Sequence, residues 1–181
     1  MMHVKEKTVH SEMIFEGKII NLRVDTVELP NHKLATREIV EHPGAVAVVP
    51  VTEDNKIVMV RQYRKPVEDF LLEIPAGKLD KDELPESCAR RELEEETGYK
   101  AETLKHLLSF YTSPGFSNEI LHIYLGQNLT QGKAHPDEDE YISSEGYSLE
   151  ELMGMIFNGS IMDSKTIIAI LATKEYLMRL K

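Results

Sequence analysis

The run at residues 77–99 constrains this chain more than any other part of its sequence, because glycines, an arginine and glutamates recur there at spacings that packing alone does not require. It reads GKLDKDELPESCARRELEEETGY. At about 3.6 residues per turn, Glu92, Glu95 and Glu96 stand on one face of a helix. Like charges so placed repel one another, and a divalent cation relieves that repulsion. The run therefore predicts a helix with a metal-binding face.

The residues around these glutamates fit a loop, a helix and a second loop. Pro85 suits the first helical turn, and Gly98 suits a left-handed C-terminal cap. Ala89 and Leu93 form an adjacent apolar stripe that would seat the helix on a core. The alternative is a solvated acidic face with no ligand. That alternative explains the charge of the run but leaves the spacing of its glycines and arginine unexplained.

Composition bounds the remaining choices. With 181 residues, 41% of them hydrophobic, the chain suits one compact domain. The formal charge of -10 argues against nonspecific nucleic-acid binding, which needs clustered Lys and Arg. No apolar run approaches the roughly 18 residues that span a bilayer, and no apolar signal segment opens the chain. We therefore expect a cytoplasmic protein without membrane contact, in which the single cysteine, Cys88, packs inside the helix rather than acting as a nucleophile.

The wider pattern places strands first, one helix in the middle and helices last. An antiparallel hairpin is predicted over residues 17–29 and 34–41, because branched residues alternate there around a turn signal. Two helices close the chain, the first opened by a capping box at Ser148 and the second capped by Asp163 or Ser164. Further strands are predicted at 45–51, 56–63, 70–74, 104–111 and 120–125. Periodicity alone predicts an α+β fold.

The spacing within residues 77–99 resembles the Nudix box, the signature of the Nudix hydrolase family. Glycine, glutamate, the arginine-glutamate run and the second glycine all stand at the motif's positions. Only Tyr99 departs from it, since the family usually has an aliphatic residue there. The resemblance implies hydrolysis of a pyrophosphate with a divalent metal as cofactor, Mg²⁺ or Mn²⁺, which hard oxygen ligands suit.

The same resemblance implies a fold and a division of the chain. The expected fold is an α/β/α sandwich around a mixed β-sheet that carries the loop-helix-loop of the box, with the N-terminal antiparallel hairpin added. Residues 1–43 are expected to form an N-terminal strand and dimerisation segment, and residues 44–181 the Nudix hydrolase domain.

Within the family, the chain looks most like the ADP-ribose pyrophosphatases. The segments VRQYR at 60–64 and EIPAG at 73–77 resemble that subgroup's lead-in to the box. Pro114 stands where those enzymes carry a marker proline, and the acidic loop 135–142 stands where they keep a glutamate outside the box. The resemblance implies Mg²⁺-dependent hydrolysis of ADP-ribose to AMP and ribose 5-phosphate, by a homodimer that exchanges N-terminal strands.

Two alternatives to this activity stay open. One is a Nudix hydrolase that acts on another nucleoside diphosphate derivative, such as an ADP-sugar, a dinucleotide or an oxidised nucleotide. The other is a noncatalytic sensor that binds a nucleotide metabolite, although such proteins often lose box glutamates and this chain keeps all of them.

Roles follow by position from the same resemblance. Glu92 and Glu96 correspond to the principal metal ligands and take part in catalysis, with Glu95 and the carbonyl oxygen of Ala76 adding to the ligand set. The subgroup takes its general base from the loop after the box. There Glu140 is the first choice, and Glu138, two residues earlier in the same acidic run, is the second.

The remaining candidates bind substrate or hold the motif together. Guanidinium groups suit phosphate oxygens, so arginines lead the substrate-binding set. That set is Arg64, Arg37, Pro114 and Glu119. The structural residues of the motif are Gly77, Glu83, Arg91 and Gly98, with Arg91 expected to pair with Glu83.

Overall fold

The computed structural model describes residues 5–135 and 141–179 of the chain. The chain divides into two compact units. The N-terminal unit comprises residues 1–44 and 111–120, and the core unit comprises residues 45–110 and 121–181. Among the described residues, no helix is both long enough and apolar enough to cross a membrane.

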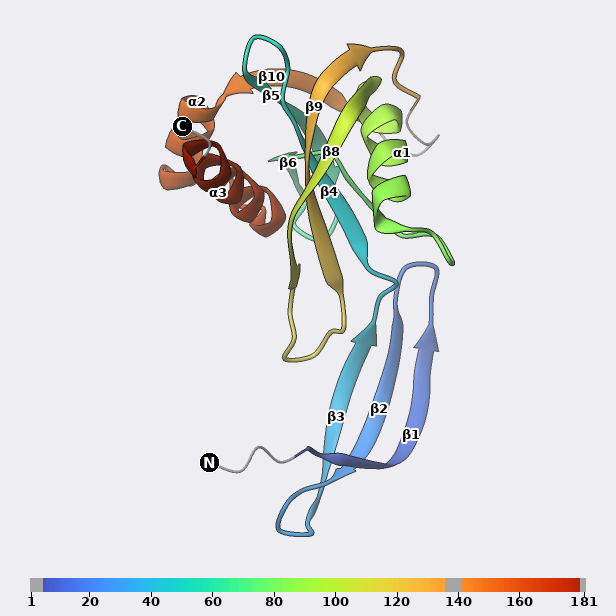
Figure 1. The fold of residues 1–181 in the computed structure, drawn as a ribbon. Coiled ribbons are helices and arrows are strands. Elements are labelled where there is room, and N and C mark those ends of the chain that lie inside the picture. The colour runs from blue at the N-terminus through green and yellow to red at the C-terminus, as the bar shows by residue number, and fades with distance from the viewer. Residues whose placement is uncertain (1–4, 136–140, 180–181) are drawn as a thin grey trace. The chain divides into compact units, whose positions relative to one another are not determined.

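The N-terminal unit is built on a three-stranded antiparallel sheet in the order β1-β2-β3 (Figure 1). Its strands are β1 (Lys7–Glu16), β2 (Asn21–Glu28) and β3 (Leu34–Glu41). The predicted hairpin is present as β2 and β3, but β2 begins at Asn21 rather than at residue 17, because residues 17–20 turn the chain back from β1. The sequence did not predict β1, since every residue of that strand is exposed and an unburied strand shows no apolar alternation.

Two sheets build the core unit. A mixed sheet has the strand order β7-β4-β9-β8, in which β4 runs parallel to β9 and antiparallel to β7. A smaller sheet has the order β10-β5-β6. The strands are β4 (Ala45–Pro50), β5 (Lys56–Arg64), β6 (Asp69–Glu73), β7 (Ala76–Lys78), β8 (Tyr99–Tyr111), β9 (Ile120–Gln131) and β10 (Ser143–Ser148). The sequence did not predict β7, which is three residues long, or β10, which has almost no apolar side chains.

Helices cover both faces of the mixed sheet (Figure 1). Helix α1 (Pro85–Thr97) packs on one face, and α2 (Leu149–Phe157) and α3 (Ser164–Arg179) pack on the other. Alternate residues of β4 therefore enter opposite cores: Val46 packs with Leu93 of α1, whereas Ala47 packs with the cluster of α2 and α3. Burial on both faces explains the continuous apolar run of this strand. The predicted α/β/α sandwich is confirmed.

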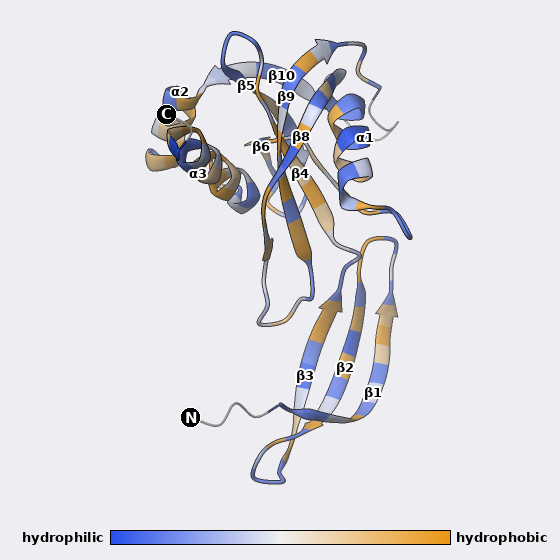
Figure 2. Ribbon diagram, in the orientation of Figure 1, coloured by the Kyte–Doolittle hydropathy of each residue, from blue (hydrophilic) through white to orange (hydrophobic). Residues whose placement is uncertain are grey.

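The ends of α1 follow the local sequence. Pro85 occupies the first turn, where its missing N–H is no loss, and no side chain caps Leu84. At the other end Gly98 adopts the left-handed conformation with φ 75°, and its amide donates to the Glu94 carbonyl oxygen. Figure 2 colours the residues of α1 as largely hydrophilic, in contrast to the mixed colouring of α3. The sequence thus leaves one side of α1 for polar chemistry.

Replacing Gly98 by alanine tests this helix end. The left-handed conformation costs an L-residue roughly 1–2 kcal/mol. In addition, a β-carbon at this position would lie 2.6 Å from the backbone nitrogen of Ala134. We expect Gly98→Ala to lower the free energy of unfolding by more than about 1 kcal/mol in urea denaturation.

The matched control is Gly154→Ala, because Gly154 lies inside α2 and a β-carbon there would meet no atom within 4 Å. This change should leave stability unchanged or raise it by about 0.5–1 kcal/mol. Equal effects of the two substitutions would show that the conformation of Gly98 is not a stability constraint.

Candidate active site

The glutamates of α1 lie against strand β7. Glu96 is buried, with 4% of its surface exposed, and its Oε2 accepts a hydrogen bond of 3.1 Å from the amide of Ala76. Glu92 lies even closer to the strand, because a β-carbon at Gly77 would stand 1.9 Å from its Cδ. Only glycine leaves room for the Glu92 carboxylate at this point. The arrangement brings two of the predicted metal ligands to the backbone of a third, Ala76.

Arg91 ties the glutamates to the loop before the helix. Its Nε and Nη2 donate to the two carboxylate oxygens of Glu83 at 3.1 and 2.9 Å. Its Nη1 donates to Glu92 at 2.7 Å and to Glu95 at 3.0 Å. The pair of Arg91 with Glu83 that the resemblance implied is thus present, and it extends to two of the box glutamates. One guanidinium holds three carboxylates that would otherwise repel one another.

The ion pair between Arg91 and Glu83 favours the charged form of both partners. The hydrogen bonds from Arg91 lower the pKa of Glu83 to about 2, from an ordinary value of 4.5. The same contact raises the pKa of Arg91, so both partners remain charged through the neutral range. Such charge-assisted, two-point hydrogen bonds fix orientation as well as distance. The loop and the helix are therefore locked together by a permanent ion pair.

Cys88 contributes packing rather than chemistry. It is fully buried on the inner side of α1, and its thiol donates a 3.3 Å hydrogen bond to the Lys78 carbonyl oxygen. Burial raises the pKa of the thiol well above its ordinary value. A cysteine that stays protonated is a poor nucleophile, because the thiolate is the reactive form.

The donor chemistry of this site fits a hard divalent cation. Its side-chain donors are carboxylate oxygens, and the backbone of β7 lies within hydrogen-bonding distance of them. Within residues 5–135 and 141–179, no group of three or more His, Cys, Asp or Glu side chains is placed to hold a metal ion. Magnesium does not require such a group, since it binds one or two carboxylates and takes its other oxygens from water and substrate phosphates.

A buried ionic network lies beside the box, at the end of β6. Glu73 is 1% exposed, and both of its carboxylate oxygens accept hydrogen bonds from Arg64, at 2.8 Å from Nε and 2.7 Å from Nη2. Lys165 of α3 also bonds to Glu73, and its amine lies 3.1 Å from Asp163. Arg64, a predicted substrate ligand, therefore has a fixed structural partner. Sequence reasoning missed Lys165, since nothing in the sequence shows that α3 begins next to β6.

Three of the predicted substrate-binding residues belong to the N-terminal unit. Arg37 of β3 is paired with Glu6, with a 3.0 Å bond from its Nε. Pro114 lies in a turn closed by a 2.9 Å bond from the Ser117 amide to the Ser113 carbonyl oxygen. Glu119 accepts a 2.6 Å bond from Thr112. Arg64 and the box glutamates belong to the core unit.

The predicted base, Glu140, and its second choice, Glu138, lie outside the described residues. The chain that precedes them is attached to α1. The amide of His135 donates a 3.0 Å bond to the carbonyl oxygen of Glu95, and the amide of Gly132 donates a 2.8 Å bond to that of Gly98. His135 is therefore held at the helix that carries the metal-ligand candidates.

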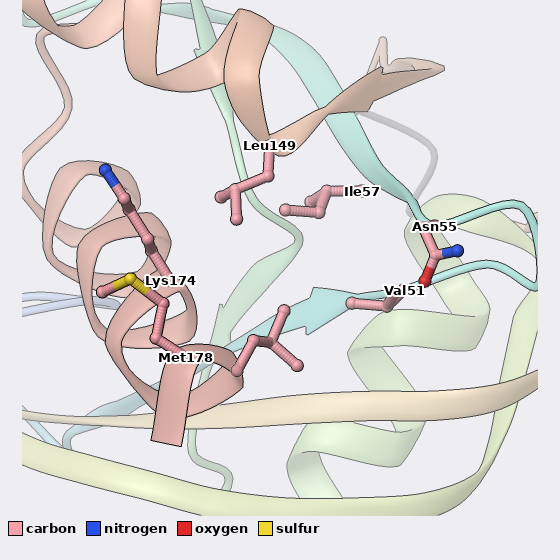
Figure 3. A pocket seen from close by; sticks show the side chains of 7 residues that line it. Val51, Asn55, Ile57, Leu149, Lys174 and Met178 are labelled. Atoms are coloured by element: carbon pink, nitrogen blue, oxygen red, sulfur yellow. The ribbon is translucent and has the colours of Figure 1, made fainter. Parts of the chain in front are cut away.

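A pocket of about 670 Å³ lies elsewhere in the core unit (Figure 3). Apolar side chains of α2, of α3 and of the segment from the end of β4 into β5 dominate its lining, with Lys174 and Asn55 as the polar members. The lining residues are Val51, Asn55, Ile57, Leu149, Lys174, Leu177 and Met178. None of the predicted site residues is among them, so this pocket is not the candidate active site.

Comparison with known proteins gives matches along nearly the whole chain. The model of the NUDIX domain matches residues 41–166, and that of the nucleoside diphosphate sugar hydrolase N-terminal domain matches residues 6–40. The chain is 50% identical to an ADP-ribose pyrophosphatase of Bacillus subtilis over 100% of both chains. It is 52% identical to a methanol dehydrogenase activator of Bacillus methanolicus, over 92% of this chain and 91% of the relative. A crystal structure of an ADP compounds hydrolase superposes with a TM-score of 0.88 at 22% identity, covering 99% of this chain and 98% of the other, which shows the shared fold.

Glu83→Gln should destabilise the protein in a pH-dependent way. Because the pKa of Glu83 is lower in the folded state, its charge stabilises the fold fully above about pH 4.5, and this contribution is lost as the pH falls towards 2. The difference in the free energy of unfolding between wild type and variant should therefore be largest above pH 4.5 and should shrink as the pH falls towards 2. Urea denaturation across this range measures it.

The matched control is Glu53→Gln, which makes the same change of charge at an exposed position of the turn after β4. This variant should show no comparable difference from wild type at any pH. A Glu83→Gln difference that persists unchanged down to pH 2 would mean that the carboxylate charge does not hold the loop.

Proposed function

The chain belongs to the Nudix domain family, and on that premise we propose that it hydrolyses ADP-ribose to AMP and ribose 5-phosphate, with Mg²⁺ as the cofactor. The observation that carries the proposal is the 50% identity to an ADP-ribose pyrophosphatase over the full length of both chains. The site geometry supports it, because Arg91 holds Glu92 and Glu95, and Gly77 lets the Glu92 carboxylate lie against β7. The protein is expected to act in the cytoplasm.

The metal would be held by Glu92 and Glu96, with Glu95 and the Ala76 carbonyl oxygen as further donors. When bound, Mg²⁺ or Mn²⁺ screens the charge of the diphosphate and of the group that leaves. The protein's own contribution is to keep the carboxylates in place before the metal arrives. The Ala76 amide holds Glu96, and Arg91 holds Glu92 and Glu95. Preorganised ligands cost little reorganisation during the reaction.

Hydrolysis breaks one P–O bond of the pyrophosphate as a water oxygen bonds to phosphorus. A carboxylate must take the proton from that water, and we assign this role to Glu140, with Glu138 as the second choice. The bond from the His135 amide to the Glu95 carbonyl oxygen supports the assignment, because Glu138 and Glu140 follow His135 by three and five residues in the sequence. The second phosphate leaves with the displaced oxygen.

Substrate contacts are proposed for four residues, Arg64, Arg37, Pro114 and Glu119. Arg64 suits the diphosphate, since Nε and Nη2 are held by Glu73 and Nη1 makes no hydrogen bond among the described residues. Arg37 is the second candidate for the diphosphate. Pro114 is proposed to belong to the substrate site, and Glu119 to bind the ribose hydroxyls or a metal. The match of residues 6–40 to a nucleoside diphosphate sugar hydrolase N-terminal domain supports a substrate-related role for the N-terminal unit.

We propose that residues 1–43 form a dimerisation segment and residues 44–181 the Nudix hydrolase domain. The N-terminal sheet exposes many large apolar side chains, which fits an interface between two copies that exchange their N-terminal strands. These residues are Val9, Met13, Ile14, Phe15, Ile19, Ile20 and Leu34. Light scattering after size-exclusion chromatography should give twice the 20.6 kDa of one chain, and a monomer at micromolar concentration would exclude the dimer.

A second candidate function is the activation of a methanol dehydrogenase. The 52% identity to a methanol dehydrogenase activator favours it. The two functions are compatible, because a pyrophosphatase can act on a nucleotide that a partner protein holds. Stimulation of a purified NAD-dependent methanol dehydrogenase that requires an intact Glu96 would place both functions at one site, whereas stimulation by Glu96→Gln would separate them.

The proposed reaction is tested by assaying purified protein with ADP-ribose, with and without Mg²⁺, beside ADP-glucose, diadenosine polyphosphates, NADH and 8-oxo-dGTP. We expect AMP release that depends on Mg²⁺ and is fastest from ADP-ribose. Faster hydrolysis of another compound would support the proposed pyrophosphatase activity but would reject ADP-ribose as the preferred substrate. Binding of ADP-ribose without hydrolysis of any compound would point to the sensor.

Glu140→Gln should lower kcat by about 10²- to 10⁴-fold, the usual contribution of a general base, and should leave Mn²⁺ binding unchanged. Steady-state kinetics and electron paramagnetic resonance of Mn²⁺ measure the two effects. Glu138→Gln serves as the matched control and should keep most of the activity, whereas Glu96→Gln should lose both activity and metal affinity. The opposite result for the two loop glutamates would assign the base to Glu138.

A further inference from the structure

The network at the end of β6 is built around one buried charge. Glu73 is 1% exposed, and it contacts two cations, Arg64 from β5 and Lys165 from α3. Burial alone would raise the pKa of Glu73, but the hydrogen bonds from Arg64 and the charge of Lys165 outweigh it and lower the pKa. Glu73 is therefore a fixed carboxylate. A buried charge of this kind is tolerated only while its partners stay in place.

Glu73 in turn fixes the direction of Arg64. A guanidinium has five N–H donors in one plane, and the edge of Arg64 formed by Nε and Nη2 donates to the two oxygens of Glu73. This two-point contact leaves little freedom of rotation, so the remaining Nη1 edge points away from Glu73. The negative charges of Glu96 and Asp163 also act on Arg64, which places its guanidinium within electrostatic range of the box glutamate.

Lys165 completes the charge balance from a different part of the fold. It is 14% exposed, and its amine lies between Glu73 and Asp163. Asp163 also accepts bonds from the Thr166 amide and hydroxyl, and the Ile74 amide donates a 3.0 Å bond to that hydroxyl. The first turn of α3 is thus bonded to the strand that leads into the box. Two acids and two bases make this cluster neutral.

We propose that Lys165 is a positioning residue, which acts through Glu73 to hold Arg64 in the orientation that receives the substrate diphosphate. Without the lysine, the Glu73 carboxylate loses the contact that fixes one of its oxygens, and the two-point contact that orients Arg64 loses its anchor. The inference rests on the proposed function, because it takes the diphosphate as the ligand of Arg64. It assigns to α3 a part in substrate binding that the motif of residues 77–99 does not contain.

A double-mutant cycle between Lys165 and Arg64 tests this proposal. The readout is the Kd of ADP-ribose, measured by isothermal titration calorimetry without divalent metal, together with KM and kcat for ADP-ribose in Mg²⁺. Lys165→Met keeps the aliphatic stem and removes the charge. We expect it to weaken binding and raise KM about tenfold, with a smaller change in kcat, and to have no further effect in an Arg64→Met background. An equal loss in both backgrounds would overturn the proposal, since Lys165 would then act independently of Arg64.

Two controls separate positioning from general stability. Lys165→Arg keeps the charge and should restore most of the affinity, while Lys174→Met makes the same change in α3 at a lysine outside the network and should leave Kd and KM unchanged. If Lys165→Met does not fold, Glu73→Gln tests the same link from the other side and should also be non-additive with Arg64→Met. Loss of affinity in Lys174→Met equal to that in Lys165→Met would overturn the proposal.

The same measurements distinguish failure of this inference from failure of the proposed function. Wild-type protein that hydrolyses ADP-ribose but gives additive losses overturns only the role of Lys165. Wild-type protein that binds ADP-ribose without hydrolysing it overturns the proposed reaction, while the cycle in Kd still decides the role of Lys165. Wild-type protein that neither binds nor hydrolyses ADP-ribose overturns both.

Discussion

The contacts of Arg91 are the constraint on which the rest of the site depends. A helix that carries Glu92, Glu95 and Glu96 on one side is unfavourable in isolation, because like charges three and four residues apart repel. Arg91 offsets this repulsion inside the same helix, with bonds to Glu92 and Glu95, and uses its other edge to hold Glu83 of the preceding loop. Lysine has a single charged centre and lacks the planar set of donors that this arrangement uses.

The layers of the core unit place this helix where its acidic side is useful. The apolar face of α1, next to the glutamates, packs against β4 through Leu93, Cys88 and Ala89, so the helix cannot rotate without exposing a buried core. Gly77 then allows the Glu92 carboxylate to approach β7 more closely than any side chain would permit. The apolar packing therefore sets the direction of the carboxylates, and the glycine sets their distance from the backbone. On the other face of the sheet, α3 supplies Lys165 to the neighbouring network.

The sequence predicted what local rules control. Spacing placed the glutamates on α1, and the Pro85 and Gly98 signals marked its ends to within a residue. The capping box at Ser148 is present with Glu151, and Asp163 accepts bonds at the start of α3. Elements without a burial pattern were missed: β1 is exposed throughout, and β10 is polar. The contact of Lys165 with Glu73 joins residues far apart in the chain, which no local pattern encodes. The roles assigned to Glu140, Arg37, Pro114 and Glu119 remain predictions.

The central claim is that the glutamates of α1 and the backbone of β7 together form the metal centre. A crystal of the protein soaked with Mn²⁺ and a non-hydrolysable ADP-ribose analogue tests this claim most directly, because the anomalous scattering of manganese locates the ion without reference to activity. The account predicts an ion bound by the carboxylates of Glu92 and Glu96 and by the carbonyl oxygen of Ala76. Manganese bound to the analogue at a position without these ligands would contradict it.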